Sequence, residues 1–345
     1  MTKISIIIPT HNRSHVLKRS IEYYSSFKNC EIIICDSSCL KDEFASIQKD
    51  INYHHCPNML FASKILFGIN KSTTEFVCLS ADDDFLSSSG LKSGYQFLYI
   101  NTDYVSVQGM YTQFTYIGKG RVVFNKLYDI CVSEQLRSDI PEDRVQFSMQ
   151  PYIQQLYSLH RKVALKKAME LASTVPRVTN VEIACNLVPM IFGKHKILDE
   201  FWMARDSRRY TTYNLSGNNH NTVIDNYHNY FKTKEGKNFI TNYGILFSTT
   251  TKTSDSKGEE VFNSAFQKYL IGVEKKHKKL LMKPSIVKSF FRKLLPESIL
   301  YLRRKRLMDK LSFGNSNISE AFEWLKMKKV IIKYGFLDEQ TDIRL

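Results

Sequence analysis

The sequence has no long hydrophobic run. No window contains the roughly 18 apolar residues of a transmembrane helix, and the apolar run within MTKISIIIPTHNR is too short for a signal peptide. The seven cysteines are scattered and include no Cys-x-x-Cys pair, which indicates reduced thiols rather than a disulfide framework. We therefore expect a cytoplasmic protein that is soluble or peripheral at the inner face of a membrane.

Glycine-rich phosphate-binding motifs are also absent from the sequence. Neither GxGxxG nor GxxxxGK[ST] occurs anywhere in the 345 residues. This absence argues against a dinucleotide-dependent oxidoreductase and against a P-loop NTPase. If the protein binds a nucleotide, a metal ion has to hold its phosphates.

Positive charge is present in excess. The net charge is +15, and residues 275–310 carry thirteen Lys or Arg against two acids. Such a balance implies an anionic partner, such as nucleic acid, an anionic membrane or a phosphorylated substrate. Within this segment, residues 286–295 alternate apolar and basic side chains with helical spacing, which is typical of a helix lying on a membrane surface. A solvated basic face or an interaction helix is the alternative, and a further helix is expected over 320–333.

The first 86 residues alternate between strand-like and helix-like patterns. Four short apolar runs predict buried strands, and the three segments between them have helical spacing. The expected strands cover residues 3–9, 31–35, 53–56 and the run from Phe76, and the expected helices cover 15–28, 41–50 and 60–70, the first capped by Ser14. This order is typical of a doubly wound α/β unit, in which ligands bind beyond the carboxyl ends of the strands.

Polar clusters follow three of these strands. They are Thr10 to Arg13, Asp36, and the three consecutive carboxylates Asp82, Asp83 and Asp84. On an extended backbone Asp82 and Asp84 would project to one side, which suits a hard divalent cation such as Mg2+ or Mn2+. An acidic turn or a helix cap is the alternative for the triad, and the shared location of the clusters disfavours it.

The motifs ISIIIPTHNR, EIIICDSS and ADDDF, in this order and spacing, resemble those of GT-A-fold glycosyltransferases of family 2. The resemblance covers about residues 3–90. It implies a GT-A, Rossmann-like mixed α/β sheet flanked by helices, and a donor site that binds a nucleotide-sugar and Mn2+ or Mg2+. The residues that it assigns to the nucleotide-sugar are Thr10, Asn12, Arg13, Asp36, Asp82 and Asp83, and those that it assigns to the metal are Asp84 and Asp82.

The sequence departs from the family pattern in one place and is ambiguous in another. His11 stands where a Tyr is common. The acidic triad allows two registers for the metal ligands, Asp82 with Asp84 or Asp82 with Asp83, and we favour Asp84.

The remaining chain is organised less clearly. We expect a helix over 91–100, strands over 104–108, 111–117, 121–124 and 152–159, and a helix over 163–173. Glu182 precedes an apolar helical stretch and, by order, matches the carboxylate that acts as catalytic base in related transferases. A first-turn Glu favoured by the helix dipole is the alternative. Arg205 to Arg209 could neutralise a leaving diphosphate, but surface solvation explains most such runs, and His220 and His228 show no zinc-site spacing.

These features predict a glycosyltransferase domain over residues 1–230 and a basic helical region over 231–345. The first domain would comprise a nucleotide-sugar half (1–100) and an acceptor half (101–230). The leading hypothesis is a metal-dependent hexosyltransferase that acts on a saccharide or lipid-linked acceptor in polysaccharide or glycan synthesis. The family resemblance implies that the transfer inverts the anomeric centre. A nucleic-acid-binding protein is the second hypothesis, although the crevice is acidic. A nucleotidyltransferase is the third, although THNRSH lacks glycines.

Overall fold

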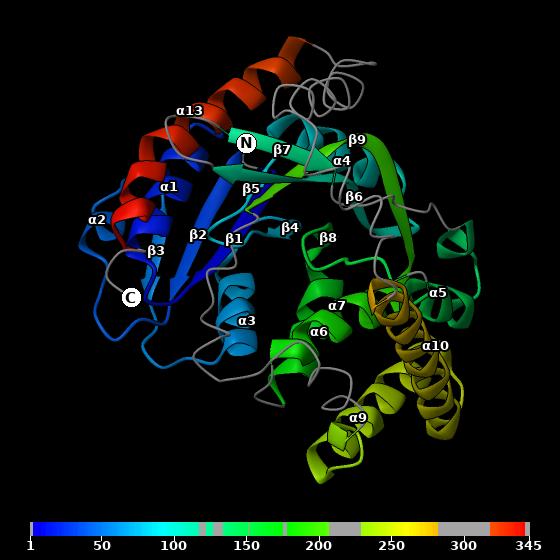
Figure 1. Ribbon diagram of the computed structural model, residues 1–345. Coiled ribbons are helices and arrows are strands. Elements are labelled where there is room, and N and C mark those ends of the chain that lie inside the picture. Colours follow the sequence, from blue (N-terminus) through cyan, green and yellow to red (C-terminus); the bar gives the residue numbers. More distant parts are fainter. Residues whose placement is uncertain are drawn as a thin grey trace.

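The computed structural model describes residues 3–116, 122–126, 134–150, 152–174, 178–206, 229–281 and 318–341. A single nine-stranded sheet runs through the molecule, in the order β3-β2-β1-β4-β8-β6-β9-β5, with β7 paired to β6 (Figure 1). The strands are β1 (Ile4–Thr10), β2 (Cys30–Asp36), β3 (Asn52–His55), β4 (Phe76–Leu79), β5 (Phe85–Leu86), β6 (Tyr104–Tyr116), β7 (Val122–Lys126), β8 (Leu159–Arg161) and β9 (Lys194–Asp206).

Strands β1 to β4 form a parallel half-sheet. β1 lies between β2 and β4 and is parallel to both, and β3 extends the sheet beyond β2. The isoleucines of β1 and β2 are almost fully buried, because helices cover both faces of a parallel sheet. The four strands predicted from the first 86 residues are therefore confirmed.

The other half of the sheet is mixed. β8 is antiparallel to β4 and β6, β9 is parallel to β6, and β5 is antiparallel to β9. The two strands expected over 104–108 and 111–117 are one continuous strand, β6. The strand expected over 152–159 is wrong, because only Leu159–Arg161 pairs with the sheet. Strand β9 is not among the elements predicted from the sequence.

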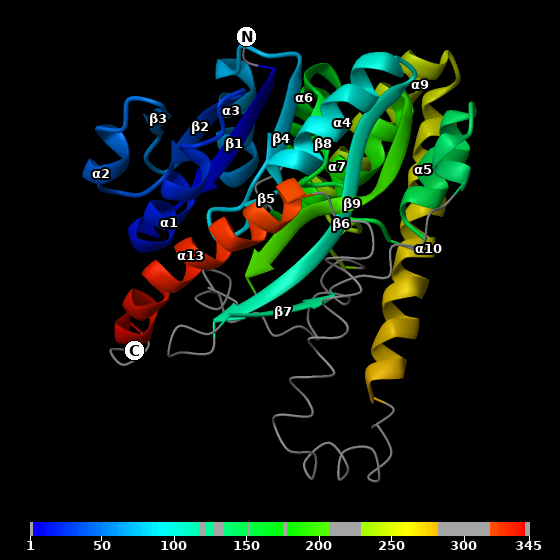
Figure 2. The same cartoon turned by 90° about the horizontal axis from the view of Figure 1, so that it is seen from above.

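Helices cover one face of the sheet around a large apolar cluster. They are α3 (Phe61–Lys71), α5 (Pro141–Ser148), α6 (Lys162–Ser173), α7 (Val178–Phe192), α9 (Lys234–Thr251) and α10 (Asp255–Leu281). Helices α3, α6 and α7 lie against the sheet, and α9 and α10 lie outside them (Figures 1 and 2). At the α9–α10 crossing, a Cβ on Gly258 would lie 2.5 Å from the carbonyl oxygen of Gly244, so the close approach requires glycine.

The opposite face is covered by α1 (Ser14–Tyr24), α4 (Ser88–Ile100) and the final helix α13 (Ile318–Thr341). A short helix, α2 (Glu43–Ser46), precedes β3, and a 3-10 turn at Glu134–Arg137 precedes α5. Figure 2 shows α13 lying alongside α1, although the two helices are far apart in the sequence. The helix expected over 320–333 is thus confirmed.

Two local expectations are wrong. Ser14 does not cap α1, because Arg13 occupies the cap position and makes no side-chain capping bond. The helix expected over 41–50 is only the four-residue α2.

The fold class is confirmed as a mixed α/β sheet flanked by helices, consistent with a GT-A fold. The division into domains at residue 230 stays a prediction. The amphipathic segment 286–295, together with His220 and His228, lies outside the described residues.

Candidate active site

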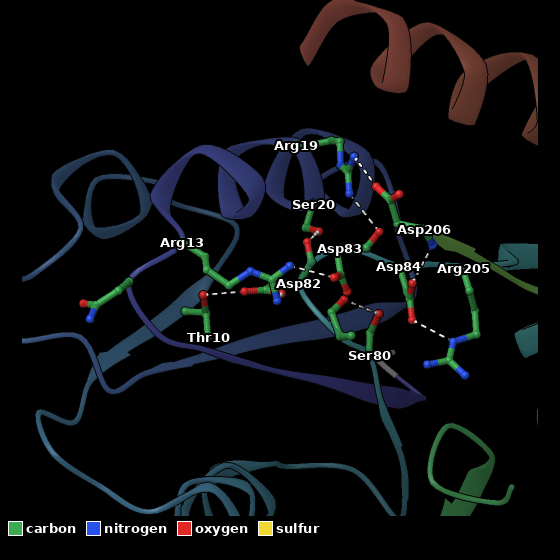
Figure 3. A network of polar contacts seen from close by, with 12 residues as sticks. Thr10, Arg13, Arg19, Ser20, Ser80, Asp82, Asp83, Asp84, Arg205 and Asp206 are labelled. Atoms are coloured by element: carbon green, nitrogen blue, oxygen red, sulfur yellow. Dashed lines mark hydrogen bonds and ion pairs between the residues drawn. The ribbon is translucent and has the colours of Figure 1, made fainter. Parts of the chain in front are cut away.

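The polar clusters predicted to share one edge of the sheet do lie together there. Thr10 and Asp36 are register partners at the carboxyl ends of β1 and β2. The acidic triad follows β4, the other neighbour of β1. Figure 3 shows the triad between Arg13 on one side and Arg205 on the other. The structure therefore brings residues from three separate motifs into one site.

The triad is a turn rather than an extended strand end. Asp82 and Asp83 form the turn, and the backbone N–H of Asp84 donates to the carbonyl oxygen of Ala81 at 3.3 Å. The expectation that an extended backbone points Asp82 and Asp84 to one side is therefore wrong. Both side chains are nevertheless buried, whereas Asp83 is partly exposed.

Arg13 binds the first two carboxylates of the triad. Its Nη1 lies 2.7 Å from Oδ1 of Asp82, and its Nη2 lies 2.6 Å from Oδ2 of Asp83. The hydroxyl of Thr10 donates to the other oxygen of Asp82 at 2.7 Å. One arginine thus offsets the repulsion between two neighbouring carboxylates.

Asn12 and Asp36 lie on the other side of Thr10. Asn12 has φ 53°, in the left-handed region that asparagine tolerates, and its backbone N–H donates to the hydroxyl of Ser38 at 2.7 Å. Asp36 accepts from the backbone N–H of Ser38 at 2.9 Å and from the hydroxyl of Tyr53 at 2.7 Å. These bonds fix the loops that follow β1 and β2.

Lys64 lies beside the site and was not predicted from the sequence. This lysine of α3 is 3% exposed, and its ammonium donates to the carbonyl oxygen of Thr10 at 2.6 Å and to the hydroxyl of Ser37 at 2.8 Å. Burial lowers the pKa of Lys64, while the charges of Asp82 and Asp36 oppose the decrease. A lysine on the apolar face of a predicted helix is the only signal that could have identified it.

The third carboxylate, Asp84, is bound by the end of β9. Its Oδ1 accepts from the backbone N–H of Asp206 at 2.9 Å, and its Oδ2 lies 3.3 Å from Nε of Arg205. Asp206 is itself paired with the buried Arg19 of α1 at 3.0 Å. Arg19 also donates to the carbonyl oxygen of Asp83 at 2.8 Å, so α1, the triad and β9 form one network.

Burial raises the pKa of both Asp82 and Asp84. The charge of Asp83 adds to the increase in each case, while Arg13 opposes it at Asp82 and Arg205 opposes it at Asp84. Two buried carboxylates with raised pKa values thus lie at one edge of the sheet. An additional cation beside them would stabilise their ionised forms.

Glu182 lies in the second turn of α7, so the first-turn alternative is wrong. Its Oε1 accepts from the amide of Gln154 at 3.5 Å, and the Tyr152 hydroxyl also bonds to it. Burial raises the pKa of Glu182, and Arg205 opposes the increase. Because Arg205 donates to Oε1 of Gln154 at 2.9 Å, it connects Asp84 to Glu182.

The carboxylates suit a divalent cation of the expected kind. In the described part of the chain, no three His, Cys, Asp or Glu side chains are gathered as a ligand set. Mg2+ is commonly held by one or two carboxylates, with phosphate oxygens and water completing its shell. Asp84 can supply one hard oxygen ligand through Oδ2, and Asp82 could supply a second where Arg13 or Thr10 releases one of its oxygens. One or two carboxylates are thus present for the predicted metal.

A sheet of this architecture with a carboxylate-rich site beyond β1, β2 and β4 defines a GT-A-type α/β protein. Residues 5–146 match the family model described as Glycosyl transferase family 2. The resemblance indicated by the three motifs is thereby confirmed over a segment that contains Thr10, Asp36 and the triad. It supports a glycosyltransferase, while Glu182 and Arg205 lie outside the matched segment.

Solved structures of S. aureus TarS also align with the chain. The alignment with one TarS crystal structure has 12% identity and a TM-score of 0.41 and covers 78% of this chain. It spans about half, 54%, of that longer chain. TarS 1-349 in complex with UDP-GlcNAc aligns with 13% identity and a TM-score of 0.41, over 81% of this chain and 92% of that one. A likeness of this degree carries no argument about substrates.

The search of curated proteins found no match to the chain. Among the helices of the described residues, none is long and apolar enough to cross a membrane.

Proposed function

We propose that the protein transfers a hexose from a nucleotide-sugar donor to a hydroxyl of a saccharide or lipid-linked acceptor. The proposed reaction depends on a divalent cation, inverts the anomeric centre, and serves polysaccharide or glycan synthesis. The observation that carries the proposal is the convergence of Thr10, Arg13, Asp36 and the acidic triad at one edge of the sheet, inside the segment that matches family 2.

In this proposal the donor binds across the ends of β1, β2 and β4. Asn12, Asp36 and the surrounding loops contact the base and ribose, and Thr10 and Arg13 hold Asp82 and Asp83 in place beside them. Asp84 and Asp82 hold the divalent cation, which would offset negative charge on the departing diphosphate.

Glu182 is the proposed base on the acceptor side. A general base works best when its pKa lies close to the working pH, and burial moves the pKa of Glu182 upward in that direction. Gln154 and Tyr152 hold the carboxylate through hydrogen bonds, so its orientation is set before an acceptor arrives. The carboxylate would take the proton of the attacking hydroxyl.

The remaining partner is a proposed anionic membrane. The basic residues of 275–310 would attract such a surface, each cation contributing about 1 kcal/mol when close to it. This contact would keep the enzyme near lipid-linked acceptors.

The first experiment is a panel of sugar nucleotides tested for Mn2+-dependent thermal stabilisation. A donor that binds only the folded protein raises the melting temperature by mass action. We expect one donor class to do so in the wild type, and the Asp84→Asn variant to lose the shift and at least about 100-fold of transfer activity.

Asp139→Asn is the matched control, because it makes the same charge change at a side chain that is 92% exposed. The control should retain donor binding and transfer. Full activity of Asp84→Asn, or of the wild type in EDTA, would contradict the metal role. Absence of stabilisation by every sugar nucleotide would contradict the donor class.

A further inference from the structure

Arg205 stands between the two sides of the candidate site. Its Nε faces Oδ2 of Asp84 at 3.3 Å, and its Nη1 donates to Oε1 of Gln154 at 2.9 Å. The guanidinium also lies over the ring of Tyr157, 5.3 Å from its centre. Figure 3 shows Arg205 approaching Asp84 from the side opposite Arg13.

The contact of Arg205 with the triad differs from that of Arg13. Arg13 holds Asp82 and Asp83 at 2.7 and 2.6 Å, and its side chain is 18% exposed. Arg205 approaches Asp84 through one nitrogen at 3.3 Å, and its side chain is 27% exposed. The contacts of Arg13 with Asp82 and Asp83 are short, whereas the contact of Arg205 with Asp84 is long, so the Arg205–Asp84 contact costs less to break.

One carboxylate oxygen of Asp84 is hydrogen-bonded to the backbone, and the other faces Arg205. Oδ1 accepts from the backbone N–H of Asp206 at 2.9 Å, which fixes the carboxylate relative to β9. Oδ2 is the oxygen turned toward the guanidinium. A divalent cation that binds Oδ2 would meet the positive charge of Arg205 at close range, and like charges at such distances repel strongly in a partly buried site.

We propose that Arg205 is an exchangeable counter-ion, which neutralises Asp84 in the donor-free enzyme and is displaced from Oδ2 by the divalent cation of the donor complex. The inference rests on the proposed metal-dependent transfer. Because Arg205 is also anchored by Gln154 and Tyr157, its charge stays beside the site after the exchange. There it attracts the anionic diphosphate of the donor.

This role gives Arg205 effects of opposite sign on two ligands. It competes with the metal for Asp84, so it weakens binding of the metal alone. It attracts a diphosphate, so it strengthens binding of the nucleotide. A residue that merely maintained the shape of the site would weaken both when replaced.

The test is calorimetric titration of the full chain with MnCl2 alone and, separately, with UDP in EDTA. We expect Arg205→Gln to bind Mn2+ about tenfold more tightly than the wild type, because a neighbouring cation has been removed. The same variant should bind UDP several-fold more weakly. Arg205→Lys, which keeps the charge, should bind Mn2+ within about twofold of the wild type.

Two further variants complete the design. Arg161→Gln removes one positive charge at the amino end of β4, where Arg161 pairs with Glu75, and should leave Mn2+ affinity unchanged. Asp84→Asn should abolish the Mn2+ binding. Circular dichroism and urea unfolding show whether each variant is folded.

The outcomes separate the inference from the proposed function. Equal Mn2+ affinity in the wild type and Arg205→Gln, or weaker affinity in the variant, would overturn the exchange but leave the metal site standing. Mn2+ binding that survives Asp84→Asn would also overturn it, by placing the ion elsewhere. Absence of Mn2+ binding in the wild type and in Arg205→Gln, both with and without UDP, would overturn both the exchange and the metal dependence.

Discussion

The two halves of the sheet are assembled in different ways. In the parallel half, three of the four strands lead directly into polar residues of the site, as β1 does with Thr10 and β2 with Asp36. In the mixed half, the residues come from three distant segments: Gln154 from a loop, Glu182 from α7 and Arg205 from β9. Local construction thus supplies most of the proposed donor side. Long-range construction supplies the proposed base Glu182 and Arg205, which lies between the two sides.

The acidic triad lies at the junction between these halves. It follows β4, which pairs with β1 of the parallel half, and it precedes β5, which pairs with β9 of the mixed half. Substitutions on the two sides of this junction should therefore have different kinetic consequences, and the following experiments test that difference.

The largest expected effect is on Glu182. Glu182→Gln keeps the shape of the side chain but removes the proposed base, so kcat should fall about 100- to 10,000-fold. The affinity for the donor, measured by thermal shift, should stay within about twofold of the wild type, because Glu182 lies on the proposed acceptor side.

The companion variant is Asp36→Asn on the donor side. It should raise the KM for the donor about tenfold with kcat largely retained, because the proposed contact of Asp36 with the donor would be common to the ground and transition states. If Glu182→Gln changed mainly the KM and Asp36→Asn mainly kcat, the assignment of the two halves to acceptor and donor would be wrong. The same conclusion would follow if both variants changed only donor binding.

A second effect concerns two buried histidines of the mixed half. Ser106 of β6 is the register partner of both His160 and His195. Burial lowers the pKa of His160 to about 4 and that of His195 to about 3. An exposed histidine has a pKa of about 6.5, so protonation of either side chain favours the unfolded chain. Their destabilising effect is absent above about pH 6.5 and grows as the pH falls toward 4.

His160→Gln tests this pH dependence. In the wild type, the carbonyl oxygen of Gln155 accepts from Nε2 of His160 at 2.8 Å. The side-chain amide of the introduced glutamine can still donate to that oxygen. Between pH 7 and pH 5 the wild type should lose about 2 kcal/mol more stability than the variant, as measured by urea unfolding. Equal losses in the two proteins would show that His160 titrates alike in the folded and unfolded chains.

The smallest effect concerns the attachment of α13 to the donor side. The carboxylate of Glu323 accepts from the hydroxyl of Ser87 and the backbone N–H of Ser89, both at 2.7 Å, at the start of α4. Glu323→Gln removes the negative charge from this helix N-terminus and should cost about 1 kcal/mol of unfolding free energy.

The matched control for that experiment is Glu170→Gln, whose side chain is exposed and paired with Lys167 on α6. It should change stability by less than about 0.5 kcal/mol. A loss in Glu323→Gln no larger than in the control would mean that the contact contributes nothing measurable to the fold.

The donor side was predictable because its information is local. A run of isoleucines indicates a buried parallel strand, and the polar residues directly after the run mark the carboxyl end of that strand. Thr10, Asp36 and the triad could therefore be placed together from the sequence. The turn at Asp82 and Asp83 was predicted only as the alternative to an extended backbone, because the residues that hold it, Arg13, Thr10 and Arg19, lie outside the motif.

The residues of the proposed acceptor side were harder to predict, because they come from segments that lie far apart in the sequence. The sequence of β9, KHKILDEFWMARD, mixes charged and apolar residues without strict alternation, because its pairing with β6 contains bulges. Arg205 therefore resembled a solvated charge run, although the fold places it against Asp84. The loop before β8 looked like a strand, but Asn186 of α7 holds it through the backbone of Ile153 and Gln155.

The burial of α13 has a consequence for how the chain is made. Met327 and Ile331 are fully buried in the same apolar cluster as Ile6 and Leu17. A ribosome releases the amino-terminal half first, so the part of α1 that α13 covers stays exposed until about residue 331 has emerged. The first strands can pair early, but the core that supports the candidate donor site closes only after α13 has been made. Helix α13 therefore sets the time at which the first half of the fold is completed.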